Sequence, residues 1–312
     1  MARTTNRIGS VLGGLTLAGG AVLAYASLIE RNAYTVRRHT IPVLPRGATP
    51  FRVLHLSDLH LAPWQQMRID WLRSLGALRP DLVVLTGDLL GHREAIPAVG
   101  EALAPLAGIP GVYVHGSNDY FGPVLKNPLR YIMPSLNREH VFGDVLDTAA
   151  LDALLDGYGW TNLDNTAAVV EVGDQAITFL GTDDAHLHRD DLDVLPEALN
   201  ALREGHGQLP PLRFGVTHAP YRRVLNTLTD LGASLIFAGH THGGQVRIPF
   251  VQSAPATNCD IPGDQARGVS HWHHGGRSAW LNVSAGVGTA ITAPVRFACR
   301  PEVSLLSLVP GR

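Results

Sequence analysis

Short apolar segments alternate with helical stretches between residues 51 and 119, and this alternation constrains the fold more than any other feature. The apolar segments cover 51–57, 82–86 and 111–115, and helical spacing runs through about 64–78 and 94–106. Strands that are apolar along their whole length and are joined by helices are typical of a parallel sheet covered on both faces. The chain is therefore predicted to be an α/β protein.

The same pattern returns in the second half of the chain, after a stretch (120–165) that we interpret as an excursion over the sheet edge. A hairpin is predicted within 169–180, and further strands at 213–217 and 235–238 follow helical stretches. Ligands in open α/β sheets bind beyond the carboxyl ends of the strands. Side chains able to bind a metal follow these strand ends, and we expect them to meet: Asp58, His60, Asp88, Asn118, His218, His240 and His242.

Composition restricts the chemistry of such a site. The chain has 312 residues, 15 histidines and two cysteines, Cys259 and Cys299. This excludes all-cysteine zinc sites and iron–sulfur clusters, so a metal would have nitrogen and oxygen ligands. The formal net charge of −2 disfavours a general nucleic-acid-binding protein. The two cysteines would pair only in an oxidising compartment, and their spacing leaves that question open.

An uncharged, largely apolar run covers residues 8–29 near the N-terminus. At about 1.5 Å per residue a helix over this run is roughly 33 Å long, which is enough to cross a bilayer. Residues 1–30 are therefore predicted to be a membrane anchor, with the rest of the chain on the extracytoplasmic side. The alternative is a signal segment cleaved near Ala24-Tyr25-Ala26, which would yield a secreted protein. Residues 31–50, with three prolines, are interpreted as a connector.

The motifs, in this order along the chain, resemble those of the calcineurin-like metallophosphoesterase superfamily. They are Asp58-x-His60, Gly87-Asp88, Gly116-Ser117-Asn118-Asp119, His218 and Gly239-His240-Thr241-His242. Three C-terminal segments, 283–288, 294–297 and 300–302, resemble its YkuE/YaeI-like bacterial branch. The resemblance covers residues 51–309. It implies one domain in which two packed β-sheets are flanked by helices, here preceded by the N-terminal hydrophobic helix.

The resemblance also implies two divalent metal ions (Mn, Fe, Zn or Co) and hydrolysis of phosphate esters by a metal-bound hydroxide. By position, Asp58, His60 and His242 would bind the first ion, Asp88 would bridge the two, and His218 and His240 would bind the second. The chain is accordingly predicted to be a membrane-associated phosphodiesterase or phosphatase. Two alternatives stay open: a catalytically impaired metal-binding envelope protein, and a hydrolase of phospholipid or lipid pyrophosphate.

The segment after the third strand departs from the family pattern. The family has Gly-Asn-His followed by an acid, in which the Asn binds the second ion and the His faces the leaving group. This chain has Gly116-Ser117-Asn118-Asp119. Strict alignment makes Ser117 the ligand, whereas a shift of one residue makes it Asn118, which we favour because an amide oxygen is the better ligand. His115 is a candidate for the missing catalytic histidine, against the simpler interpretation of a strand residue that faces away.

Three further features are candidates for a functional role, and for each of them a structural role is the alternative. His55, inside the first strand, is predicted to be a core histidine with satisfied hydrogen bonds. The stretch Gly181–Asp184, with His186 two residues later, is a candidate for lining the site. Arg296 is a candidate for binding the substrate phosphate. For all three, the structural role is the favoured interpretation.

Overall fold

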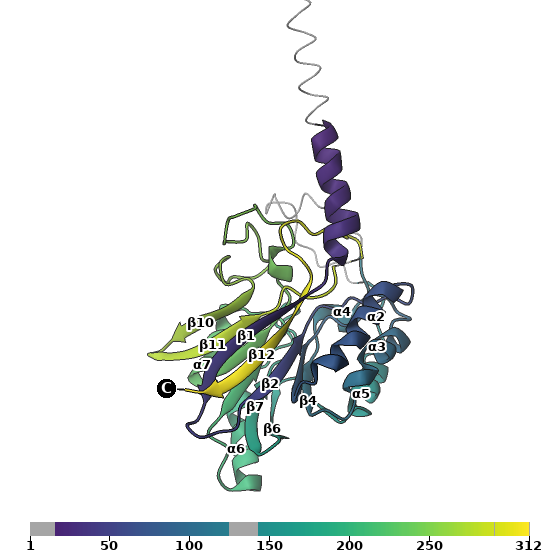
Figure 1. Cartoon of the computed structure of the whole chain (residues 1–312). Coiled ribbons are helices and arrows are strands. Elements are labelled where there is room, and N and C mark those ends of the chain that lie inside the picture. Colours follow the sequence, from purple (N-terminus) through teal and green to yellow (C-terminus); the bar gives the residue numbers. More distant parts are fainter. Residues whose placement is uncertain (1–15, 125–142, 290, 312) are drawn as a thin grey trace, which may run out of the picture.

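The computed structural model describes residues 16–124, 143–289 and 291–311, and its strands form two six-stranded sheets (Figure 1). The first sheet contains, in spatial order, β1 (Thr35–Leu44), β12 (Glu302–Pro310), β2 (Phe51–Leu56), β3 (Leu82–Thr86), β4 (Gly111–Val114) and β5 (Trp160–Asn162). The second contains β10 (Gly268–His274), β11 (Arg277–Val283), β9 (Leu235–Ala238), β8 (Arg213–Val216), β7 (Gln175–Gly181) and β6 (Thr166–Val172).

Both sheets are mixed, around parallel centres. Strands β2 to β5 are parallel, as are β7, β8, β9 and β11. Strand β12 pairs antiparallel with β2, and β6 and β10 pair antiparallel with β7 and β11. The predicted parallel sheet is thus confirmed for the strands that alternate with helices. The antiparallel strands β6 and β10 arise from tight hairpins, which parallel pairing does not allow.

Helices cover the outer face of each sheet. The first sheet is covered by α2 (Gln66–Ser74), α3 (Ile96–Leu103) and α5 (Thr148–Asp156), and the second by α6 (Leu195–His206) and α7 (Arg222–Asp230). Short 3₁₀ turns, η3 (Leu75–Leu78) and η4 (Ala104–Leu106), extend α2 and α3. The predicted two-sheet sandwich flanked by helices is confirmed.

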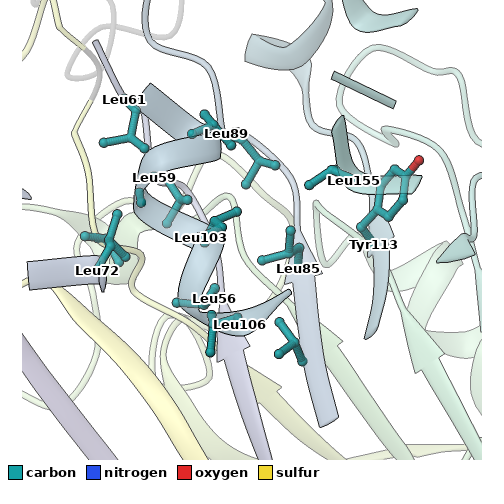
Figure 2. Packing of buried hydrophobic residues seen from close by; sticks show 14 of the residues in the cluster. Leu56, Leu59, Leu61, Leu72, Leu85, Leu89, Leu103, Leu106, Tyr113 and Leu155 are labelled. Carbon is teal, nitrogen blue, oxygen red and sulfur yellow. The ribbon is translucent and has the colours of Figure 1, made fainter. Parts of the chain in front are cut away.

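Alternation along the strands divides the core into layers. In β2, Leu54 and Leu56 pack against the outer helices, whereas Val53 packs between the two sheets. In β3, Leu85 faces the helices and Val84 faces the second sheet. Because successive side chains of a strand point to opposite faces, a strand buried on both sides must be apolar throughout. Figure 2 shows the outer layer, where leucines of the helices meet those of the strands.

The segment interpreted as a connector is largely a strand. Thr35–Leu44 forms β1, which pairs in parallel with β12 at the edge of the first sheet. Ile41 and Leu44 are buried against the sandwich, while Arg37 and Arg38 are exposed. Prolines such as Pro42 favoured a connector in the sequence. An edge strand tolerates proline because the backbone on its open side pairs with no other strand. The connector assignment is therefore wrong for these residues.

The chain enters the domain through a helix. Residues 16–24 are helical and continue into η1 (Tyr25–Ile29) and η2 (Glu30–Asn32), and this helix projects from one end of the sandwich (Figure 1). Within the described ranges, no helix combines the length and apolarity required to cross a membrane. Residues 8–15 of the run predicted to cross it lie outside those ranges. Part of the predicted edge excursion, 125–142, also lies outside them.

Candidate metal centre

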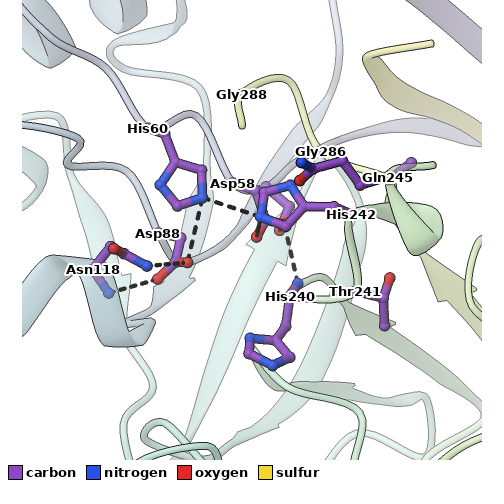
Figure 3. Close-up of polar contacts among 12 residues, drawn as sticks. Asp58, His60, Asp88, Asn118, His240, Thr241, His242, Gln245, Gly286 and Gly288 are labelled. Atoms are coloured by element: carbon purple, nitrogen blue, oxygen red, sulfur yellow. Dashed lines mark hydrogen bonds and ion pairs between the residues drawn. The ribbon is translucent and has the colours of Figure 1, made fainter. Parts of the chain in front are cut away.

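The parallel strands of both sheets end at the same side of the sandwich, and their carboxyl ends carry the predicted ligands. From the first sheet, Asp58 and His60 follow β2, Asp88 follows β3, and Asn118 lies in the one-turn helix α4 (Ser117–Tyr120) after β4. From the second sheet, His218 follows β8, and the loop after β9 carries His240 and His242. Figure 3 shows Asp58, His60, Asp88, Asn118, His240 and His242 in one place. The site therefore joins the two sheets.

Short distances connect all six carboxylate and imidazole side chains. Asp88 lies between two histidines, with its Oδ2 3.5 Å from His60 Nε2 and its Oδ1 3.5 Å from His218 Nε2. Asp58 Oδ1 lies 3.6 Å from His242 Nε2, which in turn is 3.3 Å from His60 Nε2. His240 completes the set, since its Nδ1 is 3.2 Å from His218 Nε2.

The backbone at the ligands is unusual. Asp58, His60, Asp88, His240 and His242 all have positive φ, between 41° and 64°. A non-glycine residue in this region carries strain of about 1–3 kcal/mol unless local contacts compensate, and such residues cluster at functional sites. Here the loops hold one another: the backbone N–H of Asp58 donates to Gly87 O (2.9 Å), and that of His60 to Asp88 O (3.0 Å).

Two glycines allow the ligand loops to approach this closely. A Cβ on Gly116 would collide with Asp88 Oδ1 and His218 Cε1. A Cβ on Gly239 would collide with Ser57 Oγ and Asp58 Oδ2. The glycines of the two motifs are thus required by space at the ligands, whereas sequence alone indicates only turns at these positions.

Two ligand atoms are buried without a hydrogen-bond partner among the described residues. They are Asp58 Oδ1 and His240 Nε2. Buried polar atoms are nearly always paired, so each such atom needs an explanation. Carboxylate oxygens and imidazole nitrogens are the donor types that divalent Mn, Fe, Zn and Co accept. The residues present therefore fit a divalent metal site.

The geometry divides the donors into two groups. One ligand atom from each of Asp58, His60 and His242 lies within 4.8 Å of the other two, and the same holds for Asp58, Asp88 and His218. The first group is the set that the sequence assigns to the first ion. In the second, Asp58 also takes part, whereas the sequence assigns only Asp88 to both ions. Asp88 still contacts a member of each group, His60 and His218.

Burial keeps three of the histidines neutral. It lowers the pKa of His60 to about 4, because desolvation and nearby cations outweigh the attraction of Asp88. It lowers the pKa values of His240 and His242 well below the usual 6.5. Only neutral imidazole offers a lone pair to a metal, so these three side chains are ready to bind without losing a proton.

His218 and its carboxylates behave in the opposite way. Burial disfavours the charge of His218, but Asp88, Asp58 and Asp184 outweigh that effect and raise its pKa to about 9. Burial tends to raise the pKa of Asp88, but His218 and His60 hold it well below its usual range. At Asp58 burial dominates and raises the pKa to about 7. Without a cation, the proton on His218 supplies the positive charge of the cluster, and a metal would take its place.

Asn118 and Ser117 differ in what they touch. Asn118 donates to both oxygens of Asp88, from its backbone N–H to Oδ1 and from Nδ2 to Oδ2, each at 2.7 Å. Ser117 opens α4 and is half-buried. Of the two residues that compete for the ligand position, Asn118 is thus the one whose side chain contacts a predicted ligand.

His115 is held by two carboxylates. Its Nδ1 lies 2.5 Å from Asp164 Oδ2 and its Nε2 lies 3.2 Å from Asp152 Oδ1. Burial opposes its charge, but these two partners outweigh burial and raise the pKa of His115 to about 10. Nδ1 is hydrogen-bonded, whereas Nε2 has the ion-pair contact but no hydrogen-bond partner among the described residues. Both nitrogens lie beside carboxylates that are not predicted ligands, which does not favour His115 as the replacement acid. Its catalytic role stays a prediction.

Sequence reasoning missed the function of Asp119. Its carboxylate accepts hydrogen bonds from the backbone N–H groups of Asp88, Leu89, Leu90 and Gly116, at 2.7–3.1 Å. It thereby fixes the loop that carries Asp88 against the loop that carries Asn118. The quoted motif includes Asp119, but nothing in a single sequence distinguishes a carboxylate that binds metal from one that binds backbone.

The other weighed residues occupy distinct positions. His55 is a buried core histidine, as predicted: its Nε2 contacts Thr86 Oγ1 (2.9 Å), and burial lowers its pKa to about 3. Arg296 is fully buried, and its Nη2 donates to the carbonyls of residues 285, 286 and 288. This makes it a brace for a backbone loop, which agrees with the structural role favoured from sequence. Cys259 and Cys299 are both free.

The stretch 181–186 does reach the site. The ring of His186 lies 4.5 Å from that of His240, centroid to centroid, and His186 Nδ1 lies 3.0 Å from Tyr221 Oη. Asp184 is buried, and burial raises its pKa to about 7. The candidate lining residues are thus adjacent to one of the predicted ligands.

Two stacked mixed sheets, flanked by helices and closed at one end by buried carboxylates and imidazoles, define an α/β metallohydrolase. Residues 51–244 match the calcineurin-like phosphoesterase family, and the chain belongs to that family. It is a metal-dependent hydrolase of phosphoric esters.

Relatives span nearly the whole chain. It is 28% identical over 302 residues to phosphodiesterase YaeI of Escherichia coli (strain K12), a match that covers 94% of this chain and 95% of YaeI. It is 24% identical over 319 residues to the metallophosphoesterase YkuE of Bacillus subtilis (strain 168), covering 96% and 94%. Among solved structures, TT1561 of Thermus thermophilus is similar, with a TM-score of 0.41 and 15% identity over 77% of this chain and 91% of that one.

Proposed function

We propose that this protein is a membrane-associated phosphodiesterase with two divalent metal ions in the site formed by both sheets. The observation that carries the proposal is the buried ligand cluster in which Asp58 Oδ1 and His240 Nε2 have no hydrogen-bond partner among the described residues. The name of YaeI supports a diester substrate, since that relative is a phosphodiesterase along almost the same length of chain.

The predicted ligands form two sets, one for each metal ion. Asp58, His60 and His242 would hold one ion, and Asp88, His218 and His240 the other, with Asp88 placed between the two groups. When bound, two such ions supply a hydroxide nucleophile and neutralise the charge that develops on the phosphoryl oxygens. Asp119 keeps the loops of Asp88 and Asn118 in register through its four backbone hydrogen bonds.

Asn118 takes the position next to the second group in this proposal. Its contacts with both oxygens of Asp88 support the shifted register over the strict alignment, which would give that position to Ser117. An amide can present its oxygen to a cation and keep its N–H₂ group for a carboxylate. Asn118 would therefore orient Asp88 as well as bind.

The histidine that usually protonates the leaving group is missing from its motif, and the contacts of His115 with Asp152 and Asp164 do not favour it as the replacement. General acid catalysis typically contributes about 10²–10⁴-fold, so its absence matters most for poor leaving groups. We therefore expect esters of acidic alcohols to be the better substrates. Membrane association is supported by the uncharged run over residues 8–29, which precedes the domain directly.

The test is hydrolysis of bis(nitrophenyl) phosphate by the full chain after chelation and after addition of Mn²⁺. We expect activity to vanish on chelation and to return with Mn²⁺. Tight Mn²⁺ binding without hydrolysis of this diester, or of nitrophenyl phosphate, would instead support the alternative, a catalytically impaired metal-binding envelope protein. The departure from the family motif at Ser117 and Asn118 is the observation that supports this alternative.

A further inference from the structure

Apart from Val145, the large exposed hydrophobic side chains of the described residues belong to three groups at the end of the sandwich where the metal site lies. One group follows the ligand His242 in the chain, another follows His60, and a third lies on the helix at residues 16–29. They are Val246, Ile248, Phe250 and Val251, then Trp64 and Met67, then Leu17, Val22, Leu23, Tyr25, Leu28 and Ile29. A contiguous exposed apolar surface usually marks a binding face.

Backbone contacts join the helix to the loop after His242. The N–H of Arg296 donates to Ala26 O (3.1 Å), and the N–H of Cys299 donates to Glu30 Oε1 (2.7 Å). The same segment pairs with the loop through Arg247 N–H to Phe297 O (2.9 Å). The helix and the loop 245–251 are therefore both fixed to one segment, 295–299.

The loop after His60 also reaches the base of the helix. Trp64 and Met67 line a pocket of about 320 Å³ together with Arg31, Tyr34 and Arg68. Arg68 also donates to the carbonyl of His60 (3.1 Å), so this pocket adjoins a ligand loop. The helix leaves the domain at the same end as α4, which carries Asn118 (Figure 1).

The chemistry of this face fits a lipid bilayer better than a protein partner. The helix at residues 16–29 belongs to the uncharged run that the sequence shows over residues 8–29. Arg31, which is partly exposed, lines the same pocket as Trp64, at the point where the apolar helix meets the domain. Cations and aromatic rings at such a boundary are typical of the headgroup level of a membrane.

We propose that the loop 245–251 and Trp64 insert into the bilayer beside the helix, so that the metal site opens at the membrane surface. The substrate is then a phosphate ester carried on a membrane lipid. This substrate class rests on the proposed phosphodiesterase function, whereas the insertion itself does not. Tethering and insertion together would raise the local concentration of a lipid substrate at the site.

Insertion is tested without catalysis, in the full chain reconstituted in phosphatidylcholine–phosphatidylglycerol vesicles. Phe250→Trp should show tryptophan quenching by lipids brominated in their acyl chains, above that of the wild type. The matched control is His274→Trp, at the far end of β10, which should add none. Equal quenching at the two positions, or none at Phe250→Trp, would overturn the proposal and point to a protein partner for this face.

The substrate class is tested with two esters that share one reacting group. Ethyl nitrophenyl phosphate is soluble, and hexadecyl nitrophenyl phosphate resides in the vesicle. We expect the double variant Ile248→Ser/Phe250→Ser to lose about tenfold or more in kcat/KM on the hexadecyl ester and to keep the wild-type value on the ethyl ester. Ile248→Val/Phe250→Leu, which stays apolar, should keep both.

The outcomes separate the two proposals. A wild type that hydrolyses both esters, with an equal loss or no loss on both in the serine double variant, would overturn the lipid substrate and leave the phosphodiesterase intact. A wild type that hydrolyses neither ester with Mn²⁺ present would overturn the phosphodiesterase. Quenching at position 250 would then still support the membrane face.

Discussion

His115 is only three residues from Asn118 along the chain, yet the buried charges around His115 and those of the ligand cluster are balanced differently. Around His115, carboxylates of Asp152 and Asp164 contact the two ring nitrogens, and Tyr113 donates to Asp152 (2.9 Å). In the ligand cluster, Asp58 Oδ1 and His240 Nε2 have no hydrogen-bond partner among the described residues, and His240 Nε2 has no ion-pair partner there either. His115 Nε2 also lacks a hydrogen bond, but it lies 3.2 Å from a carboxylate oxygen of Asp152.

The comparison separates a structural group from a functional one. A buried charge is costly unless it is paired, so a group whose partners all come from the chain needs nothing further. A group whose atoms converge without pairing is stable only if something else supplies the missing charge. His115 is therefore expected to contribute to folding, and the ligand cluster to metal binding.

Asp88→Ala should produce the largest effect. Asp88 contacts histidines of both donor groups, so its loss removes the charge that allows two cations to lie close together. We expect kcat/KM on bis(nitrophenyl) phosphate to fall by about 10³-fold or more, because metal catalysis supplies several kcal/mol and each 1.36 kcal/mol is tenfold. Steady-state kinetics with saturating Mn²⁺ measures the loss.

The same variant should also lose the stabilisation that metal provides. A ligand at 100 times its Kd stabilises the folded state by about 2.7 kcal/mol. Mn²⁺ should therefore raise the Tm of the wild type and of His115→Gln, but raise that of Asp88→Ala much less. Wild-type turnover in Asp88→Ala, in an assay that chelation still abolishes, would contradict the assignment of Asp88 to both ions.

Asn118→Ala and Ser117→Ala should have intermediate effects that differ from each other. Asn118 touches both oxygens of Asp88, so its truncation should reduce kcat/KM by about 10-fold or more, whereas Ser117→Ala should stay within about twofold. Asn118→Asp serves as a matched control of similar shape that retains an oxygen donor. A larger loss for Ser117→Ala than for Asn118→Ala would support strict alignment with the family motif instead.

Much of the fold could be predicted because the strands are buried on both faces. Leu82–Thr86 and Leu235–Ala238 are apolar almost without interruption, and their ends were located correctly from sequence. Thr35–Leu44 was missed because an edge strand has one open side and so keeps arginines and a proline. In the excursion at 120–165, a helix near 148–155 was predicted from sequence and is α5, whereas the short strand β5 was missed.

The sequence predicted which side chains form the candidate site, but not the contacts that hold them in place. Strand-end position alone brings Asp58, Asp88 and His218 to one edge. It does not indicate that Asp119 binds four backbone N–H groups or that Arg296 braces a loop, because both depend on how the loops around the site are folded. The positive φ of five ligands is also invisible in a sequence, since aspartate and histidine adopt it only when the surrounding loops require it.

His115→Gln should have the smallest effect on turnover, within about twofold, and a distinctive effect on stability. The pKa of His115 is about 10 in the folded chain, against the ordinary 6.5. A raised pKa in the folded state stabilises the protein fully below pH 6.5, and this stabilisation is lost as the pH rises towards 10. His115→Gln should therefore lower the free energy of unfolding by about 1–3 kcal/mol below pH 6.5, a buried ion-pair effect reduced by the partial exposure of Asp152. The deficit should shrink as the pH rises.

His55→Gln is the matched control for that measurement. His55 is also a buried histidine, but burial lowers its pKa to about 3, so it is neutral in both folded and unfolded chains above pH 6.5. Its substitution should change stability by a constant amount over the alkaline range, whatever the size of that amount. Thermal unfolding of the wild type, His115→Gln and His55→Gln across this range tests the difference.

A stability deficit of His115→Gln that does not shrink towards pH 10 would mean that the two carboxylates hold a neutral ring. The charge of His115 would then have no structural role. A large loss of activity on alkyl but not nitrophenyl esters in His115→Gln would instead return His115 to the role of proton donor, because only poor leaving groups need the proton.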